Sequence, residues 1–259
     1  MSHQITVIIT TFNREIELKK AIRSVLDQTY KADEILVVNN GEKKLDLSEI
    51  KDLNKFNFKI INCEKNLHAA GGRNIGANTA TNYYLAFLDD DDYWEKNYLK
   101  KVSEVIDKAK PDLIVSTLYD MKTNNLYKRI NDLNLTQIYL YNPGINGSNI
   151  VITKIALNEV GGFKNFLFPS EDKSLLIDLI LNKKKIVITD SKVFCSLDTL
   201  DKTSRSLETL EKGTKNFIKY YNNKFSFSEK IMVNYKLSKI EIKNKKYTKI
   251  FKLFFLYFF

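Results

Sequence analysis

Four consecutive aspartates, Asp89–Asp92, follow an apolar run at residues 83–88. Neighbouring carboxylates repel one another and stay ionised at low cost only beside a positive partner. No Lys or Arg lies within three residues of either end of this acidic run. A divalent cation is therefore one candidate partner, because Mg²⁺ and Mn²⁺ prefer oxygen ligands. The alternative is a solvated acidic loop.

A second pair of acidic residues, Glu171 and Asp172, lies far along the chain from the first. The apolar residues from Leu175 to Ile180 recur at helical spacing, which predicts a helix that begins near Ser170, a residue suited to the N-cap. Acidic side chains stabilise the first turn of a helix. A purely structural role is therefore the alternative to a chemical role for this pair.

The elements that must position these residues alternate along the chain. β-branched and apolar runs predict strands at residues 5–9, 34–38, 58–61, 83–88, 113–116, 150–152 and 186–188. Helical patterns are expected at residues 15–28, 73–79, 96–108, 154–160 and after residue 170. This α/β alternation predicts a central, mainly parallel sheet flanked by helices.

Ligands of such sheets bind beyond the carboxyl ends of the strands. Polar clusters stand at several predicted strand ends: Thr10–Arg14, Asn39–Gly41, His68–Arg73 and Asp89–Asp92. We expect these clusters to converge on one crevice, which makes a solvated acidic loop a poorer explanation for the aspartates. The segment His68–Gly72 is expected to be a loop that leads into the helix at residues 73–79.

The 259 residues suffice for one large domain or for one domain with an appendage, and 44% of them are hydrophobic. The two cysteines form no disulfide framework, which favours a reducing compartment. The first residues do not resemble a signal peptide, and no apolar run reaches the roughly 18 residues of a membrane span.

The net charge of +10 is unevenly distributed. Residues 202–259 contain 14 Lys and Arg against 4 Asp and Glu, so this segment carries the whole excess and the body is neutral. Such an asymmetry favours an anionic partner.

The motifs occur in an order that resembles the family-2 glycosyltransferases, which have the GT-A fold. The pieces are VIITTFNRE, GGRNIGAN, FLDDDD, VGGF and SED, and the resemblance covers roughly residues 4–195. It implies an inverting transfer of a hexosyl or N-acetylhexosaminyl group from a nucleotide-diphosphate sugar, with Mn²⁺ or Mg²⁺ as cofactor. It also implies a bacterial polysaccharide pathway, such as that of lipopolysaccharide or capsule.

By this resemblance, FLDDDD corresponds to the DxD element of the family. Asp91 is the expected metal ligand, and Asp92 helps the metal or orients the acceptor. Asp89 faces the donor nucleotide, and Asp90 is grouped with it, although alternation along an extended segment directs its side chain away. In the alternative register, which is shifted by one residue, Asp90 and Asp92 take the nucleotide and metal roles.

The resemblance assigns Asp172 as the catalytic base, with Glu171 as the second candidate. Arg73 is expected at the donor diphosphate, because a guanidinium makes paired bonds to phosphate oxygens. The alternative is that Arg73 pairs with an aspartate of the acidic run. Arg73 can make this ion pair and contact the diphosphate at the same time.

The loop after the first strand holds the nucleotide base in this family, which implies roles for Thr10, Phe12 and Arg14. Core packing is the alternative for Phe12. Asn39 and Asn40 stand where the family often has Asp, which is a departure, because asparagine carries no charge. A UDP-sugar is favoured as the donor, but this departure weakens the assignment of uridine.

On the acceptor side we expect Trp94, Asn146 and Ser148, with core packing as the alternative for Trp94. The acceptor is expected to be a glycan or a lipid-linked glycan. His68 is a weaker candidate for a metal or phosphate contact, and packing on the backbone is favoured for it.

The expected organisation is a GT-A catalytic domain at residues 1–200, with a nucleotide-binding half at 1–110 and an acceptor-side half at 111–200. Residues 201–259 form a basic, aromatic and helical extension. Such a segment suits the surface of an anionic membrane, so we expect a cytoplasmic protein on the inner face of a bacterial membrane. The alternative is that the extension packs on the core.

Two further function classes compete with this interpretation. A nucleic-acid-binding protein is suggested by the Lys and aromatic residues, but the body is neutral, the crevice is acidic and no nucleic-acid motif is present. A catalytically inactive protein that binds sugar nucleotides is the other. An aspartyl phosphatase would need the acidic run after the first strand, which instead ends in TTFN.

Overall fold

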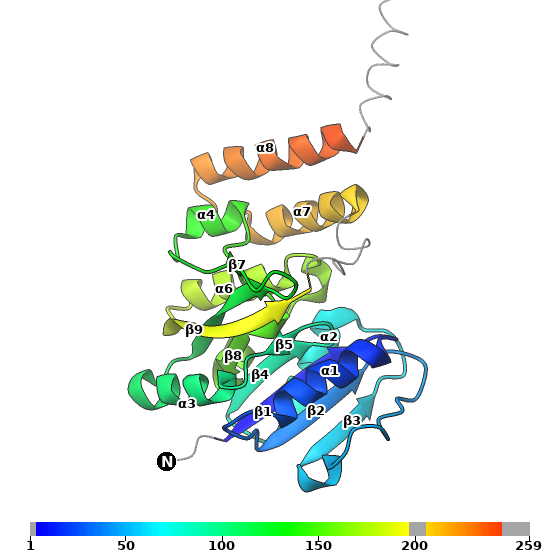
Figure 1. The fold of residues 1–259 in the computed structure, drawn as a ribbon. Coiled ribbons are helices and arrows are strands. Elements are labelled where there is room, and N and C mark those ends of the chain that lie inside the picture. Colours follow the sequence, from blue (N-terminus) through cyan, green and yellow to red (C-terminus); the bar gives the residue numbers. More distant parts are fainter. Residues whose placement is uncertain (1–3, 197–205, 245–259) are drawn as a thin grey trace, which may run out of the picture.

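The computed structural model describes residues 4–196 and 206–244, and a curled nine-stranded sheet forms the centre of this part of the chain (Figure 1). The strands are β1 (Ile5–Thr11), β2 (Glu34–Asn39), β3 (Phe58–Asn62), β4 (Tyr84–Asp89), β5 (Tyr93–Trp94), β6 (Leu113–Asp120), β7 (Leu126–Lys128), β8 (Ile150–Thr153) and β9 (Ile186–Cys195). Their order is β3-β2-β1-β4-β8-β6-β9-β5, and β7 pairs with β6.

The first half of the sheet is parallel, and the second half is mixed. β3, β2, β1 and β4 all run in one direction. β8 runs antiparallel to both of its neighbours, β4 and β6, whereas β6 and β9 are parallel to each other. The mainly parallel sheet predicted from the sequence is therefore confirmed, with β8, β5 and β7 running antiparallel to the strands they pair with.

The helices cover both faces of this sheet. They are α1 (Glu15–Leu26), α2 (His68–Thr79), α3 (Tyr98–Ala109), α4 (Leu135–Leu140), α5 (Lys154–Glu159), α6 (Glu171–Leu181), α7 (Leu207–Tyr221) and α8 (Phe227–Lys243). Three short 3₁₀ helices accompany them: η1 (Leu53–Lys55), η2 (Gly147–Asn149) and η3 (Asn165–Leu167). The apolar side chains of α1 and α3 pack on one face of the sheet, and those of α2, α5 and α6 pack on the other.

The helix α2 begins at His68, so the expected loop at His68–Gly72 is wrong. Glycine is a poor helix former, which is why the sequence pattern places the helix start too late. The structural reason for glycine is close approach, because a Cβ atom at Gly72 would lie only 2.5 Å from the Asn40 side-chain nitrogen. The helix thus lies directly against the end of β2.

Several strands are longer than predicted. β1 extends through Thr10 and Thr11, which are buried strand residues rather than loop residues. β6 and β9 continue to Asp120 and Cys195, beyond an irregularity between Val115 and Thr117 where their register shifts. Such irregularities restart a ladder in a new register, so a strand continues through residues whose local pattern is polar.

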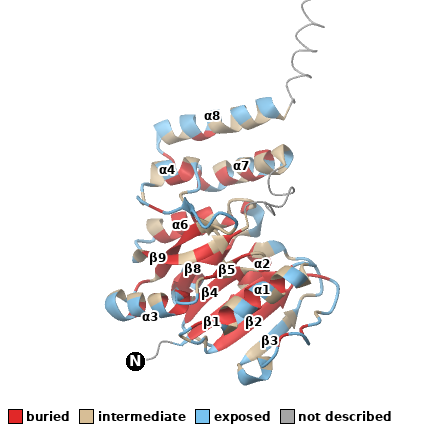
Figure 2. Ribbon diagram, viewed as in Figure 1, coloured by how far each residue is buried: buried red, intermediate tan, exposed pale blue. Residues whose placement is uncertain are grey.

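The C-terminal helices differ in how they pack. α7 buries Phe217 and Tyr221 in the same core as α2 and α6, so this helix is part of the packed body. α8 buries only Val233 and is mostly exposed or half-buried (Figure 2). The alternative of packing on the core is therefore confirmed for α7. The final run, KIFKLFFLYFF, lies outside the described residues.

Four apolar side chains on α8 are each more than half exposed: Phe227, Ile231, Tyr235 and Ile242. Their spacing places them along one face of the helix, and we call them the α8 stripe. Within residues 4–196 and 206–244, no helix has the length and apolarity needed to cross a bilayer.

Candidate active site

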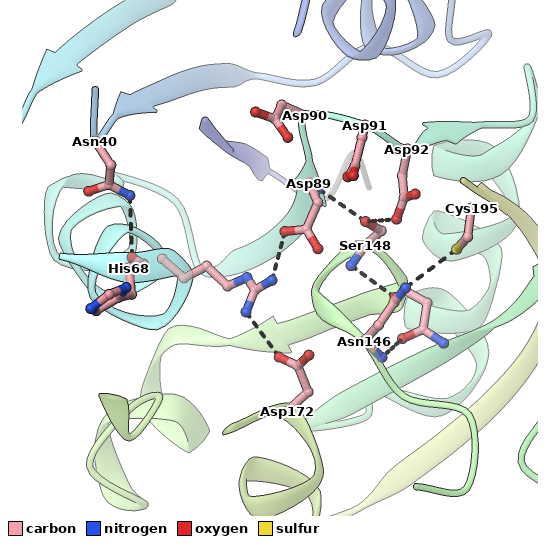
Figure 3. A network of polar contacts seen from close by, with 12 residues as sticks. Asn40, His68, Asp89, Asp90, Asp91, Asp92, Asn146, Ser148, Asp172 and Cys195 are labelled. Carbon is pink, nitrogen blue, oxygen red and sulfur yellow. Dashed lines mark hydrogen bonds and ion pairs between the residues drawn. The ribbon is translucent and has the colours of Figure 1, made fainter. Parts of the chain in front are cut away.

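The polar clusters that the sequence places at strand ends meet at one edge of the sheet. The ends of β1 and β4 lie there beside the start of α6 and the loop that leads into β8 (Figure 3). The loop before β8 reaches this edge because β8 runs against its neighbours. The site therefore combines residues that follow parallel strands with residues that precede an antiparallel one.

Asp90 points away from its neighbours in the acidic run (Figure 3). Its carboxylate accepts a hydrogen bond from Thr11 Oγ1 at 2.7 Å and lies 2.8 Å from an Arg14 nitrogen. Burial raises the pKa of Asp90 to about 7, although Arg14 opposes the shift. The predicted orientation of Asp90 is confirmed, and its inclusion among the nucleotide contacts is not supported, because its side chain is buried.

Asp92 is also buried and engaged. Ser148 Oγ donates to its carboxylate at 2.5 Å, and the Ser196 N–H donates at 3.2 Å. Burial raises its pKa well above the ordinary range. Ser148 is fully buried and also accepts a hydrogen bond from the Asp89 N–H at 3.0 Å. The expectation that Ser148 contacts an acceptor is therefore wrong: its hydroxyl ties the acidic run to the loop before β8.

Asp89 and Asp91 are the partly exposed members of the run, with 24% and 18% of their side chains accessible. Asp91 lies 2.6 Å from an Arg14 nitrogen, so Arg14 bridges Asp90 and Asp91. The described residues contain no cluster of three His, Cys, Asp or Glu poised to hold a metal. Mg²⁺ is commonly held by one or two carboxylates together with substrate phosphates, so this pair fits a cation that is shared with a nucleotide.

Arg73 lies at the centre of the site and is only 3% exposed. Its Nη2 donates to Asp89 Oδ1 at 2.7 Å, and its Nη1 donates to Asp172 Oδ1 at 3.0 Å. The guanidinium also lies over the Phe163 ring, 5.3 Å from the centroid. The predicted pairing with an aspartate of the acidic run is confirmed, and the contact with a diphosphate stays a prediction.

Asp172 and Glu171 occupy the first turn of α6. Burial raises the pKa of Asp172 to about 7, although Arg73 opposes the shift and 17% of the side chain is accessible. The Gly147 N–H also bonds to this carboxylate. Burial raises the pKa of Glu171 as well, and its Oε2 is buried without a hydrogen-bond partner. The Asp172 carboxylate can therefore exchange a proton near neutral pH.

The two asparagines at the end of β2 differ in how fully their side chains are hydrogen-bonded. Asn39 is engaged on both sides: its amide donates to Lys43 O and Asn62 Oδ1, and its Oδ1 accepts from the Gly41 N–H. Asn40 donates to His68 O at 3.3 Å, but its buried Oδ1 has no partner. Asn39 thus has a structural role, and Asn40 keeps an acceptor available.

Phe12 and Thr10 lie at the end of β1. The Phe12 side chain is 44% exposed, so the alternative of core packing is wrong for it, whereas Thr10 is buried. His68 is exposed and its ring stacks on Phe168 at 6.3 Å between ring centroids, so its contact is with a side chain, whereas the sequence favoured packing on the backbone.

The structure does not bring Trp94 to the acceptor side. The Trp94 ring is 3% exposed, stacks on Tyr98 at 4.2 Å, and donates from Nε1 to Ser148 O at 2.8 Å. The alternative of core packing is confirmed. Asn146 is half-buried, and its side chain caps η2 and donates to Cys195 Sγ at 3.4 Å.

Thr11 and Phe163 are site residues that the sequence does not single out. Thr11 holds Asp90, and the Phe163 ring supports Arg73. Both lie inside quoted motifs, VIITTFNRE and VGGF, but no local pattern indicates which distant side chain each one meets.

Comparisons with known proteins bear on this site. A family model described as glycosyl transferase family 2 matches residues 6–163. The glycosyltransferase GlyA of Streptococcus pneumoniae is 32% identical over 117 residues, which is 45% of this chain but only 17% of GlyA. WfaP of Escherichia coli, a UDP-Glc:alpha-D-GlcNAc-diphosphoundecaprenol beta-1,3-glucosyltransferase, is 30% identical over 177 residues, which is 65% of this chain and 66% of WfaP.

Solved structures share the fold. The TarS 1–349 fragment of S. aureus in complex with UDP-GlcNAc has a TM-score of 0.67 and 19% identity, and the match covers 96% of this chain and 75% of that one. The mannosyltransferase PcManGT of Pyrobaculum calidifontis, in complex with GDP-Man and Mn²⁺, has a TM-score of 0.65 and 14% identity, with 92% and 70% covered.

Proposed function

Because the chain belongs to glycosyl transferase family 2, we propose that it transfers a sugar from a UDP-sugar to a hydroxyl group of a lipid-linked glycan, with inversion. The observation that carries the proposal is the ion-pair bridge of Arg73, which holds Asp89 and Asp172 on opposite sides of one guanidinium. An inverting transfer needs two separate carboxylates, one near the diphosphate and one that accepts the proton of the acceptor hydroxyl.

The donor nucleotide is proposed to bind at the ends of β1 and β2. The unpartnered Oδ1 of Asn40 is a buried acceptor, and the N3–H of uracil is a donor that would satisfy it. The exposed Phe12 ring offers a surface on which a base can stack. The UDP-GlcNAc bound to TarS and the UDP-Glc in the name of WfaP support a uridine donor.

Asp91 is the proposed metal ligand, with Asp89 beside it toward the nucleotide. Both side chains are partly exposed and supply the hard oxygen ligands that Mg²⁺ and Mn²⁺ prefer. A divalent cation bound there supplies positive charge against the departing diphosphate. Arg14, which lies 2.6 Å from Asp91, balances part of the charge of this carboxylate.

Asp172 is the proposed base. Its carboxylate takes the proton of the acceptor hydroxyl while the oxygen forms the new bond to the sugar, and the bond between sugar and diphosphate breaks to release the nucleoside diphosphate. A pKa of about 7 suits this role, because a base works best near the operating pH. Glu171 is the second candidate, since it lies in the same helical turn.

The acceptor is proposed to be a glycan on a lipid diphosphate, as the name of WfaP states for that protein. An enzyme with such a substrate works at a membrane. The α8 stripe and the excess of Lys and Arg in residues 202–259 support peripheral binding to an anionic bilayer on its cytoplasmic face.

The function is tested by incubating the protein with UDP-Glc, UDP-GlcNAc, UDP-Gal and GDP-Man, each with Mn²⁺ or with chelator. The acceptor is a short-chain lipid carrying GlcNAc diphosphate, and the measured quantities are released nucleoside diphosphate and elongated lipid. Metal-dependent elongation with one uridine donor supports the proposal. Tight binding of a uridine nucleotide without transfer to any acceptor would favour the inactive sugar-nucleotide-binding protein instead.

A further inference from the structure

We propose that α7 positions the catalytic base, because this helix holds the segment that leads into α6 and so fixes Asp172 against Arg73. The inference rests on the proposed function, in which Asp172 is the base. It assigns a catalytic consequence to a helix whose sequence suggests only a basic C-terminal extension.

The tightest contact lies at Gly213, in the middle of α7. A Cβ atom at this position would overlap the Phe168 carbonyl oxygen and would lie 2.7 Å from Pro169 Cδ. Real Cβ atoms essentially never approach a backbone atom so closely. The helix and the Phe168–Pro169 segment therefore fix each other, and only Ser170 separates this segment from Glu171.

Further along α7, two polar side chains continue the contact. The Asn216 amide donates to the Phe166 carbonyl at 2.8 Å. The Tyr221 hydroxyl lies 2.8 Å from Asp178 Oδ1 and 3.0 Å from the Ser174 carbonyl. Tyr221 is buried, so these bonds are shielded from water. The helix thus holds both the approach to α6 and its second turn.

The residue that follows the base is held from the same side. The Lys173 ammonium donates to the Tyr139 carbonyl of α4 at 3.0 Å and lies 4.0 Å from the centroid of the Phe217 ring of α7. Lys173 is 5% exposed, so its side chain points into the body while Asp172 points into the site. Asp172 is therefore flanked on both sides by residues that α7 contacts.

The geometry makes α7 a positioning element, because its contacts are made to the chain around Asp172. A carboxylate displaced by a fraction of an ångström loses its alignment with the acceptor hydroxyl, whereas donor binding at the ends of β1 and β2 is unaffected. The expected signature is a loss of kcat without a matching change in the donor KM.

The test is Gly213→Ala, with Lys212→Ala as the matched control at an exposed position of the same helix. Alanine is the better helix former, so a defect at Gly213 reports the contact rather than helix propensity. We expect faster amide hydrogen exchange in residues 165–176, a fall in kcat of about tenfold, and a donor KM within about twofold of wild type. Lys212→Ala is expected to behave as wild type.

If Gly213→Ala does not fold, Asn216→Ala is tested in its place. We expect this variant to show a smaller increase in hydrogen exchange and a smaller fall in kcat. Unchanged exchange or unchanged kcat in the folded variants would overturn the proposal, as would a parallel loss of UDP binding measured by calorimetry. If the wild-type protein transfers no sugar, the proposed function fails by itself. Hydrogen exchange then still decides whether α7 holds the segment.

Discussion

Asp89 and Asp172 share one guanidinium, since Arg73 donates to the first at 2.7 Å and to the second at 3.0 Å. One residue belongs to the end of a strand and the other to the start of a helix. The two sides of the site, which we propose bind the nucleotide and the acceptor, are therefore tied together by a single side chain that is almost wholly buried.

Replacing Arg73 with Met should damage both stability and activity. Removing one partner from a buried ion pair leaves uncompensated charge and costs roughly 3–5 kcal/mol, so the urea midpoint should fall substantially. Arg73→Lys keeps the charge but not the forked geometry, so it should retain more stability and still lose activity. Equal stability of the two variants would show that charge pairing at Arg73 does not stabilise the fold.

The pH dependence of the transfer rate should follow the ionisation of the Asp172 carboxylate. The base must be ionised, and the pKa of Asp172 is raised to about 7, so the rate should rise with pH through about 7 and then level off. Asp172→Asn should lower kcat by roughly 10²-fold or more. UDP binding by this variant serves as the control. A rate that already levels off below about pH 5 would point to a base with an ordinary carboxylate pKa.

Asp91 and Asp90 provide a matched pair for the metal. Asp91→Asn should weaken Mn²⁺-dependent UDP binding by roughly tenfold or more, because a carboxylate ligand is lost. Asp90→Asn should weaken it far less, because Asp90 faces Thr11 and Arg14 inside the protein. Calorimetry with and without chelator measures both. Stronger loss in Asp90→Asn would establish the alternative register.

Lys173 should make stability depend on pH in the alkaline range. Burial lowers its pKa from 10.5 to about 7, so between these values the unfolded chain holds a proton that the folded protein has released. The free energy of unfolding therefore rises with pH over this window. Relative to Lys173→Met, the wild type should gain roughly 2–4 kcal/mol between about pH 7 and pH 10. Urea unfolding measures this, and parallel pH profiles would contradict it.

The α8 stripe should carry the membrane contact. Replacing Phe227, Ile231 and Tyr235 together with Ser removes three exposed apolar side chains, each worth about 1.5–3 kcal/mol when buried. Binding to phosphatidylglycerol vesicles in a flotation assay should fall by at least about tenfold.

The matched control replaces three apolar residues that are exposed to a similar degree elsewhere: Ile16, Leu126 and Ile155. Vesicle binding should survive in this control and weaken with added salt, because the lysines contribute through screened charge. An equal loss of vesicle binding in both triple variants would show that the α8 stripe does not carry the membrane contact.

The sequence predicts seven of the nine described strands and most helices, because β-branched runs and helical spacing are local signals, but it misses the short strands β5 and β7. It places the start of α2 too late, since the close approach that requires Gly72 involves Asn40, a residue distant in the chain. The orientation of Asp90 follows from alternation, which is also local. The contact of Arg73 with Asp172 cannot be predicted from a local pattern, because only the packing of α6 brings Asp172 to Arg73. The burial of Phe217 also depends on packing against distant residues, so the Lys-rich sequence of α7 does not indicate it.

The wide separation in sequence of the residues that meet at the site sets the order in which the site is completed on the ribosome. Domains are synthesised from the N-terminus, so the acidic run emerges before the loop that contains Ser148, and Arg73 emerges before Asp172. A nascent chain that ends within β6 therefore carries its aspartates without the hydroxyl that holds Asp92 and without the second partner of Arg73. The bridge of Arg73 between Asp89 and Asp172 therefore forms only after residue 172 has left the exit tunnel.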